Sequence, residues 1–268
     1  MCSDLYNLYN GDCLEIMKQI PDASVDCIIC DLPYGTTQCS WDSVIQLDLL
    51  WEHYTRIMKD NCPIVLFGSQ PFTATLICSN LKMFREEVVW LKNKAGSGFL
   101  NGKRHTKVHE NIVVFSKTGD FTFNPQMWKV DDKDFITHRK TFKEITVGNS
   151  IYSPINRVRQ VDTGDRNPIS IVSYAVPINP ANTKTYSNDI DVRYHPTQKP
   201  LSLMDYLVKT YSNKGDTVLD NCMGSGTTGV ACIRNHRDFI GIELQEDYFK
   251  IASDRMSKEE SEMSRKLF

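Results

Sequence analysis

The sequence feature that most constrains the fold is a recurring pair, in which a short apolar run is followed by a helical or turn-rich segment. The apolar runs are Val25–Cys30, Ile64–Phe67, Glu87–Leu91, Asn111–Ser116, Thr217–Asp220 and Phe239–Ile242. Helical periodicity is present in Leu201–Tyr211, Thr228–Asn235 and Glu246–Met256. This alternation is typical of a largely parallel sheet with helices on both faces, and the runs are too short to span a bilayer. The pattern therefore predicts an α/β fold.

The composition changes between about residues 118 and 193, where Asn, Asp, Thr, Pro, Lys and Arg dominate and periodicity is weak. With 268 residues, the chain is long enough for one large domain that carries a smaller lobe. Because a structureless stretch of this length is uncommon inside a compact domain, we interpret it as an inserted lobe. We therefore expect a core built from residues 1–117 and 194–268, with residues 118–193 inserted between its halves.

The cysteines indicate reduced thiols and no metal site. There are nine, an odd number, and Cys27, Cys30 and Cys78 lie in or beside apolar runs. This usage favours a cytoplasmic protein over a disulfide framework, and the N-terminus does not resemble a secretory signal. Cys27 and Cys30 form a C-x-x-C pair, but no second Cys/His pair follows at zinc-finger spacing.

The net charge of −2 gives no sign of nucleic-acid binding, and the distribution of charge along the chain is more informative. Residues 82–117 contain eight basic and three acidic side chains, together with Gly96, Gly98 and Gly102. A solvated face is the commoner explanation of such a stretch. A loop that follows phosphates is the alternative.

A glycine-rich turn in the C-terminal half predicts a nucleotide-type cofactor. The run that ends at Asp220 is followed by Gly224 and Gly226, and a helix opens at Thr227. Glycines let the backbone approach a ligand closely, and a helix N-terminus favours a negative group. The next run ends in Glu243, whose carboxylate can accept both ribose hydroxyls. This layout does not separate a nicotinamide dinucleotide from S-adenosylmethionine, although the missing third glycine counts against the nicotinamide.

The segment Asp31-Leu-Pro-Tyr34 supplies a second motif at the end of an apolar run. A stiff turn is the minor alternative, because an aromatic side chain exposed at the carboxyl end of a strand is poorly placed for packing. Functionally, the Tyr34 ring offers a flat face on which an extruded base can stack. The Asp31 carboxylate and a backbone carbonyl can accept the two hydrogens of an exocyclic amine, and Pro33 stiffens the backbone that carries them.

Together, these two motifs resemble those of the DNA amino-methyltransferases, whose signature is Asp-Pro-Pro-Tyr plus a glycine-rich cofactor loop. The base motif comes first here, as in the permuted β-class of that family. Further segments are similar to family segments: Asn10-Gly-Asp12-Cys13, Leu66–Phe72, His109–Lys117 and His195-Pro-Thr-Gln-Lys-Pro200. The resemblance covers most of residues 1–117 and 194–256.

The resemblance implies a seven-stranded, mostly parallel Rossmann-like methyltransferase sheet with an inserted recognition region. It implies transfer of a methyl group from S-adenosylmethionine to N6 of adenine in double-stranded DNA. The implied catalytic residues are Asp31, Leu32, Pro33 and Tyr34. The implied cofactor-binding residues are Asp12, Cys13, Asp31, Lys199, Asp220, Cys222, Gly224, Ser225, Gly226, Thr227 and Glu243.

Two positions depart from the family pattern. Leu32 replaces the first proline of the tetrapeptide, a change that a carbonyl-mediated role tolerates. Asn221-Cys222 replaces Pro-Phe before the cofactor glycines, which bears on cofactor affinity more than on cofactor identity.

We expect contacts with base edges and with phosphates to be divided between the inserted region and the basic stretch. The predicted DNA-binding residues are Lys92, Lys103, Arg104, Arg139, Lys140, Arg157 and Arg159. Several alternatives stay open: N4-cytosine methylation, an RNA or protein-glutamine methyltransferase, and a catalytically silent DNA-binding module. A homodimer, an associated restriction endonuclease and the recognition sequence cannot be read from the chain.

Overall fold

The computed structural model describes residues 5–35, 43–94, 102–103, 105–129, 165–177 and 193–266. The chain divides into two units. The main unit comprises Met1–Asn124 and Ser170–Phe268, and the second comprises Pro125–Ile169. The second unit is shorter at both ends than the inserted region expected at 118–193.

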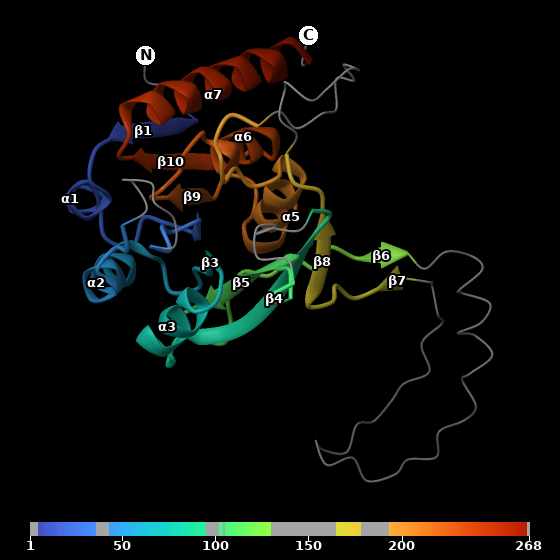
Figure 1. The fold of residues 1–268 in the computed structure, drawn as a ribbon. Coiled ribbons are helices and arrows are strands. Elements are labelled where there is room, and N and C mark those ends of the chain that lie inside the picture. The colour runs from blue at the N-terminus through green and yellow to red at the C-terminus, as the bar shows by residue number, and fades with distance from the viewer. Residues whose placement is uncertain are drawn as a thin grey trace, which may run out of the picture. The chain divides into compact units, whose positions relative to one another are not determined.

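The main unit is built on one large sheet (Figure 1), which has eight strands among the described residues. From one edge to the other the strands are β1 (Tyr6–Asn10), β10 (Asp238–Glu243), β9 (Thr217–Asp220), β2 (Cys27–Cys30), β3 (Ile64–Gly68), β5 (His109–Phe115), β4 (Phe84–Lys92) and β8 (Ile171–Tyr174). Strand β5 pairs antiparallel with β3 and β4, and the other neighbouring pairs are parallel. The predicted mostly parallel α/β sheet is therefore confirmed.

Residues of the central strands alternate between the two faces of the sheet. Ile28 and Cys30 of β2 pack into one hydrophobic core, whereas Cys27 and Ile29 pack into the other. All four side chains are fully buried. A strand with apolar side chains on both faces requires cover on both, which explains the continuous apolar runs in the sequence. Each of the six runs overlaps one of these strands.

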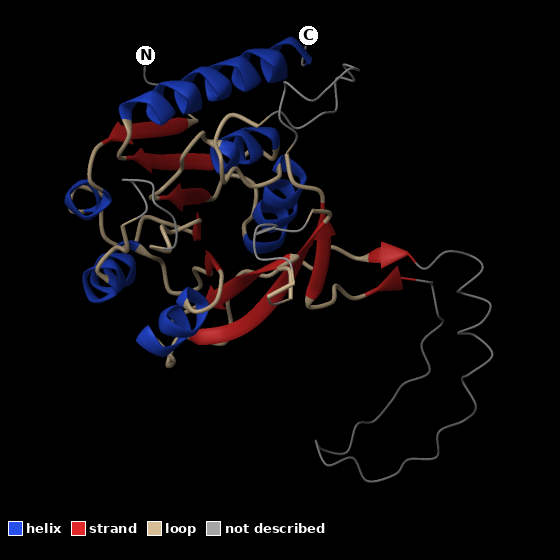
Figure 2. Ribbon diagram, in the orientation of Figure 1, coloured by secondary structure: helices blue, strands red, loops and turns tan. Residues whose placement is uncertain are grey.

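Helices cover both faces of the sheet (Figure 2), as its two-sided apolar character requires. The first face is covered by α1 (Cys13–Met17), α2 (Leu47–Ile57) and α3 (Phe72–Ser79). The second face is covered by α5 (Leu201–Tyr211), α6 (Thr227–Arg234) and α7 (Glu246–Lys266). In the described part of the chain, no helix has both the length and the apolar character needed to cross a membrane.

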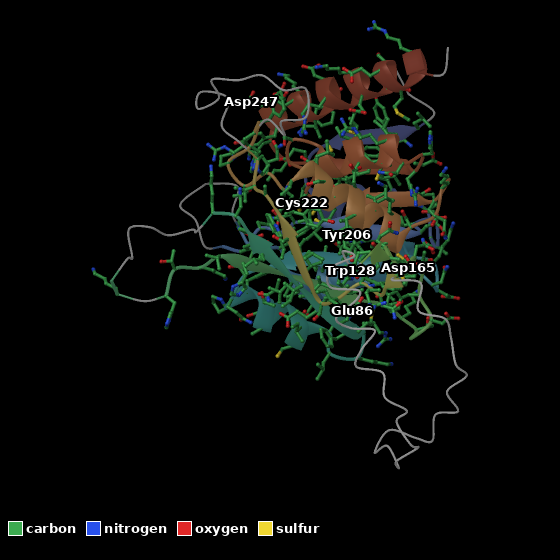
Figure 3. All side chains as sticks on the ribbon, turned by 90° about the vertical axis from the view of Figure 1, so that its right-hand side faces the viewer. Glu86, Trp128, Asp165, Tyr206, Cys222 and Asp247 are labelled. Carbon is green, nitrogen blue, oxygen red and sulfur yellow. The ribbon has the colours of Figure 1, made fainter. Side chains whose placement is uncertain are left out.

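Strand β8 makes the sheet one strand wider than the seven-stranded sheet that the resemblance implied. It comes from residues expected in the inserted region, yet it pairs in parallel with β4 at the sheet edge. The Trp90 indole N–H donates to the Tyr174 carbonyl at 3.0 Å, which fixes the pairing. Helix α5 packs here: the rings of Tyr206 (labelled in Figure 3) and Tyr174 lie 5.9 Å apart. Residues 171–174 therefore belong to the core fold.

The second unit contains a small antiparallel pair, β6 (Trp128–Lys129) and β7 (Asp165–Arg166). The Trp128 indole N–H donates to the Asn167 carbonyl at 3.1 Å, which ties the two strands together. Trp128 remains 46% exposed. Residues 130–164, including most of the predicted DNA-binding arginines, lie outside the described residues.

Candidate active site

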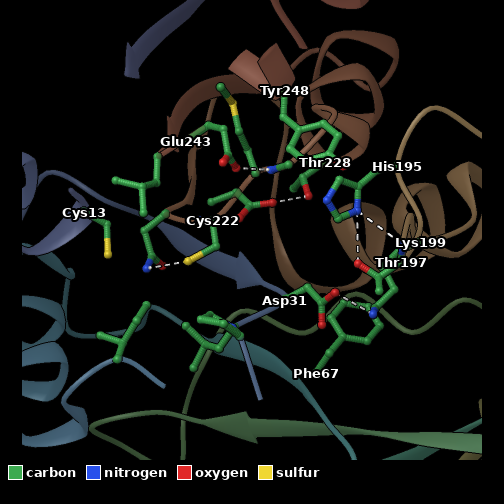
Figure 4. Close-up of a pocket in the computed structure, with 18 of the residues that line it drawn as sticks. Cys13, Asp31, Phe67, His195, Thr197, Lys199, Cys222, Thr228, Glu243 and Tyr248 are labelled. Carbon is green, nitrogen blue, oxygen red and sulfur yellow. Dashed lines mark hydrogen bonds and ion pairs between the residues drawn. The ribbon is translucent and has the colours of Figure 1, made fainter. Parts of the chain in front are cut away.

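The carboxyl ends of the parallel strands converge on one cavity of about 470 Å³. Asp31 follows β2, Asp220 ends β9 and Glu243 ends β10, and all three line the cavity. Figure 4 shows Asp31 and Glu243 among the lining residues. Parallel neighbours bring their carboxyl ends to the same sheet edge, which is the usual place for ligands in open α/β sheets. The two motifs, far apart in sequence, thus share one site.

The Glu243 carboxylate accepts a hydrogen bond from the glycine turn after β9 and holds the turn in place. The Gly224 N–H donates to Glu243 Oε2 at 2.9 Å, and the Gln245 N–H donates to Oε1 at 2.8 Å. Gly224 has a φ of +53°, and nothing lies within 4 Å of the position that a Cβ would take. The turn therefore leaves open space beside a buried carboxylate, as a closely bound ligand requires.

Asp220 lies almost fully buried at the floor of this half of the cavity. Its carboxylate accepts the Thr228 hydroxyl at 2.5 Å and the Cys222 N–H at 3.1 Å. Burial raises the pKa of Asp220 to about 7, against the lowering effect of these donors. The group is thus balanced between its neutral and ionised forms at neutral pH.

Gly226 differs from the other predicted cofactor residues, because it does not line the cavity. It is the N-cap of α6 with a φ of +78°. A Cβ there would lie 2.8 Å from the Ala252 Cβ, on α7. Gly226 therefore allows α6 to pack closely against α7.

The N-terminal segment contributes one wall. Asp12 caps α1, where its Oδ1 accepts the N–H groups of Leu14 at 2.8 Å and Glu15 at 3.2 Å. The neighbouring Gly11 N–H donates to the Glu243 carbonyl at 2.9 Å. These bonds set Asp12 and Cys13 against the glycine turn, and both residues line the cavity.

The Asp31-Leu-Pro-Tyr34 segment also lines the cavity, with all four of its residues. Asp31 Oδ1 accepts the Tyr34 hydroxyl at 2.6 Å. The Tyr34 ring stacks on Phe72, with centroids 5.1 Å apart and 25° between the planes. The Leu32 side chain, at the position of the family proline, is 3% exposed and packs into the core.

Lys199, which the sequence analysis placed with the cofactor, pairs with the tetrapeptide instead of the glycine turn. Its ammonium lies 2.6 Å from Asp31 Oδ2 and 3.2 Å from Glu110 Oε2. Lys92 pairs with the other oxygen of Glu110 and lies over the Trp90 ring. The charge of Lys92, a predicted DNA contact, is therefore already balanced within the protein. Lys103 is exposed, and Arg104, Arg139, Lys140, Arg157 and Arg159 lie outside the described residues.

Asn221 and Cys222, which replace the family Pro-Phe, are held by a polar network that the sequence analysis missed. The Tyr54 hydroxyl donates to Asn221 Oδ1 at 2.5 Å in the buried interior. The thiols of Cys13, Cys30 and Cys222 gather beside it, and burial raises the pKa of Cys30 to about 12. Thiols and an amide therefore surround the two positions at which the family has Pro-Phe.

His195, the first residue of the His-Pro-Thr-Gln-Lys-Pro segment, orders the cavity rim. Its ring packs edge-on against Tyr248 with centroids 4.1 Å apart, and its Nδ1 accepts the Thr197 N–H at 3.2 Å. Burial and nearby Lys199 lower the pKa of His195 to about 4. It is therefore neutral at neutral pH.

Among the described residues, the cavity gathers every predicted catalytic residue and every predicted cofactor residue except Gly226. Glu110 and Tyr248 also line it, and the sequence analysis did not assign them. A signal for Glu110 existed, since it lies in the His109–Lys117 segment that resembles a family strand. Its role required knowledge of which lysines reach it.

Comparisons with known proteins agree with this geometry. The family model described as DNA methylase, of the N6 and N4 methyltransferases, matches residues 25–254. The DNA adenine methyltransferase YhdJ of Escherichia coli K12 is 29% identical, over 93% of this chain and 82% of its own. The type II methyltransferase M.HpaI of Haemophilus parainfluenzae is 26% identical, over 93% of this chain and 73% of its own. The structure of M1.HpyAVI with S-adenosylmethionine has a TM-score of 0.60 and 25% identity, over 94% of this chain and 100% of its own.

Proposed function

The chain belongs to the DNA methylase family of N6 and N4 amino-methyltransferases, and we propose that it transfers a methyl group from S-adenosylmethionine to N6 of adenine in DNA. One observation carries the proposal. Asp31-Leu-Pro-Tyr34 and the glycine turn at Gly224 line the same cavity at the carboxyl ends of the strands. The first supplies acceptors and a ring for a planar amine, and the second supplies a site for a nucleoside.

The cavity fits S-adenosylmethionine in size and chemistry. A volume of about 470 Å³ is within the range of small-molecule sites. The open space beside Gly224 leaves room for the backbone to approach the cofactor, and the Glu243 carboxylate keeps lone pairs for ribose hydroxyls beyond the two N–H groups it accepts. When bound, this cofactor supplies an electrophilic methyl group on a sulfonium.

The tetrapeptide prepares the amine for attack. An exocyclic amine is a weak nucleophile because its lone pair is delocalised into the base. Hydrogen bonds from its two N–H groups to the Asp31 carboxylate and the Leu32 carbonyl favour a pyramidal nitrogen with a localised lone pair. The Tyr34 ring, with Phe72 stacked behind it, offers a flat surface for the base outside the duplex. Asp31 then accepts the proton that the methylated nitrogen releases, so catalysis is mainly positioning.

Adenine is preferred over cytosine in this proposal for two reasons. The tetrapeptide begins with Asp31, which is typical of the adenine enzymes that it resembles. The relative at 29% identity carries the name DNA adenine methyltransferase. N4 of cytosine presents the same two hydrogens and is the second candidate.

For DNA recognition, we propose that the inserted region reads base edges and that Lys103 of the basic stretch contacts phosphate. The inserted region lies between core halves that already hold the cavity. Substitution of arginines in 139–166 should then change site choice, whereas Lys103→Ala should weaken binding to all DNA and flatten its salt dependence.

The deciding experiment is transfer of a radioactive methyl group to unmodified double-stranded DNA, followed by nucleoside analysis. N6-methyladenine is expected. N4-methylcytosine would overturn the choice of base, and absence of transfer would overturn the activity. Asp31→Ala should lower transfer by orders of magnitude while cofactor binding persists. Asp60→Ala is the matched control, because the Asp60 side chain is 95% exposed and distant from the tetrapeptide in sequence.

A further inference from the structure

A buried lysine stands between the catalytic carboxylate and a second acid. The Lys199 side chain is 8% exposed, and its ammonium lies 2.6 Å from Asp31 and 3.2 Å from Glu110. The rings of Phe67 and Tyr34 lie within 4.9 Å and 5.9 Å of the ammonium, measured to their centroids. A cation held this far from water needs its ion partners to stay charged.

The charges continue in alternating order from the cavity toward the sheet edge: Asp31, Lys199, Glu110 and Lys92. Glu110 Oε2 is buried and makes no hydrogen bond of good geometry within the described part of the chain. Its interaction with Lys199 is therefore electrostatic, across the 3.2 Å between Glu110 Oε2 and the Lys199 ammonium nitrogen. The Glu110 carboxylate therefore attracts the Lys199 ammonium and competes with the Asp31 carboxylate for it.

The electrostatics of Asp31 depend on this competition. The pKa of Asp31 lies above its ordinary value, because burial raises it more than the Lys199 ammonium lowers it, and the Glu110 carboxylate raises it further. The Tyr34 hydroxyl also lowers it by donating a hydrogen bond to Oδ1. The other titratable groups that face Asp31 are Cys30, in the preceding position, and Asp220 on β9. Lys199 is the cation that pairs directly with this carboxylate.

We propose that Lys199 and Glu110 are positioning residues that act through Asp31: Lys199 keeps the carboxylate ionised and aimed into the cavity, and Glu110 limits how strongly it does so. This inference rests on the proposed function, because an ionised Asp31 is what accepts the amine hydrogens. The inference assigns Lys199 to the part of the site that would bind the base, whereas the sequence placed it with the cofactor. It also gives a role to Glu110 that the tetrapeptide alone does not reveal.

Two substitutions should move the same titration in opposite directions. Lys199→Met keeps the apolar stem and removes the cation, so the acid limb of the methyl-transfer pH profile should shift upward by about one to three pH units. Activity lost at pH 7 should return at higher pH. Glu110→Gln removes the competing anion, so the acid limb should shift downward. Lys209→Met, on the exposed face of α5, is the matched control and should leave the profile unchanged.

The titration of Asp31 is measured independently of activity by carbon-13 NMR of aspartate-labelled protein, with the signal assigned by its loss in Asp31→Asn. Opposite shifts in the two variants support the inference, and equal or absent shifts overturn it, even if the wild type transfers no methyl group and the proposed function fails. Calorimetry with S-adenosylmethionine gives a second readout. Affinity within about threefold of wild type in Lys199→Met is expected, whereas a loss of a hundredfold would return Lys199 to the cofactor. If Lys199→Met fails to fold, Glu110→Gln still decides through the direction of its shift.

Discussion

Replacing Asp220 by asparagine should stabilise the ligand-free protein at neutral and alkaline pH. Asp220 is 3% exposed at the end of β9 and accepts hydrogen bonds from Thr228 and from the Cys222 N–H. Asparagine has the same shape. Its oxygen can accept the Cys222 N–H, and its amide can donate to the Thr228 hydroxyl, which is both donor and acceptor. The substitution therefore removes a buried charge and retains the contacts.

The magnitude follows from the pKa of Asp220, which burial raises from 3.8 to about 7. Because this value lies above the one in the unfolded chain, the folded protein binds more protons at this site between these pH values. Its stability therefore falls as pH rises from about 4 to about 7 and stays low above that. The difference in pKa corresponds to about 4 kcal/mol of unfolding free energy.

Urea unfolding followed by circular dichroism, without cofactor, measures this effect from pH 5 to pH 8. Asp220→Asn should be more stable than wild type by about 4 kcal/mol at pH 8 and by about 2 kcal/mol at pH 5, where the native carboxyl is still protonated. An advantage that does not change with pH would refute the reasoning. The exposed Asp254→Asn, on α7, should show no such pH dependence.

Three further outcomes follow from the structure. Gly229→Ala should lower the unfolding free energy by about 1–3 kcal/mol in urea, because its Cβ would lie 2.2 Å from the Met256 sulfur; unchanged stability would show that Met256 moves aside freely. Tyr54→Phe should cost about 1–3 kcal/mol, since it leaves the buried Asn221 oxygen without its donor at 2.5 Å, and a melting temperature equal to wild type would contradict this. Glu243→Ala should weaken S-adenosylmethionine binding by calorimetry, by about 1.5–3 kcal/mol for each lost charged hydrogen bond; equal affinity in a folded variant would remove the carboxylate from the cofactor site.

The central strands and the two motifs were predictable from the sequence because their signals are local. A run such as Val25–Cys30 is apolar on both faces, and only a buried strand needs that pattern. Strand β1 has no such signal, since Tyr6–Asn10 is a largely exposed edge strand with two asparagines. Helix α1 was missed because it is only five residues long, too short for a periodic pattern.

The charge network of the site was not predictable, because it joins segments that are remote in the chain. Lys199 and Asp31 are 168 residues apart, and no spacing rule relates them. The ion pair of Lys92 has the same origin: its partner Glu110 lies on the neighbouring strand, so the pair could not be predicted before the strand pairing was known. The surroundings of the two departures from the family motif could be described only from the structure, in which Leu32 packs into the core and Asn221 accepts the Tyr54 hydroxyl.

The strand order has a consequence for how the protein is made. Strands β1 and β2 lie near the N-terminus, but β10 and β9 stand between them in the sheet. A ribosome that adds roughly 5–20 residues per second reaches β9 about 10–40 s after it completes β2. During that interval both strands have unpaired edges and uncovered apolar side chains, which invite aggregation. We therefore expect truncated chains that end before β9 to aggregate, because these edges and apolar side chains stay uncovered in them.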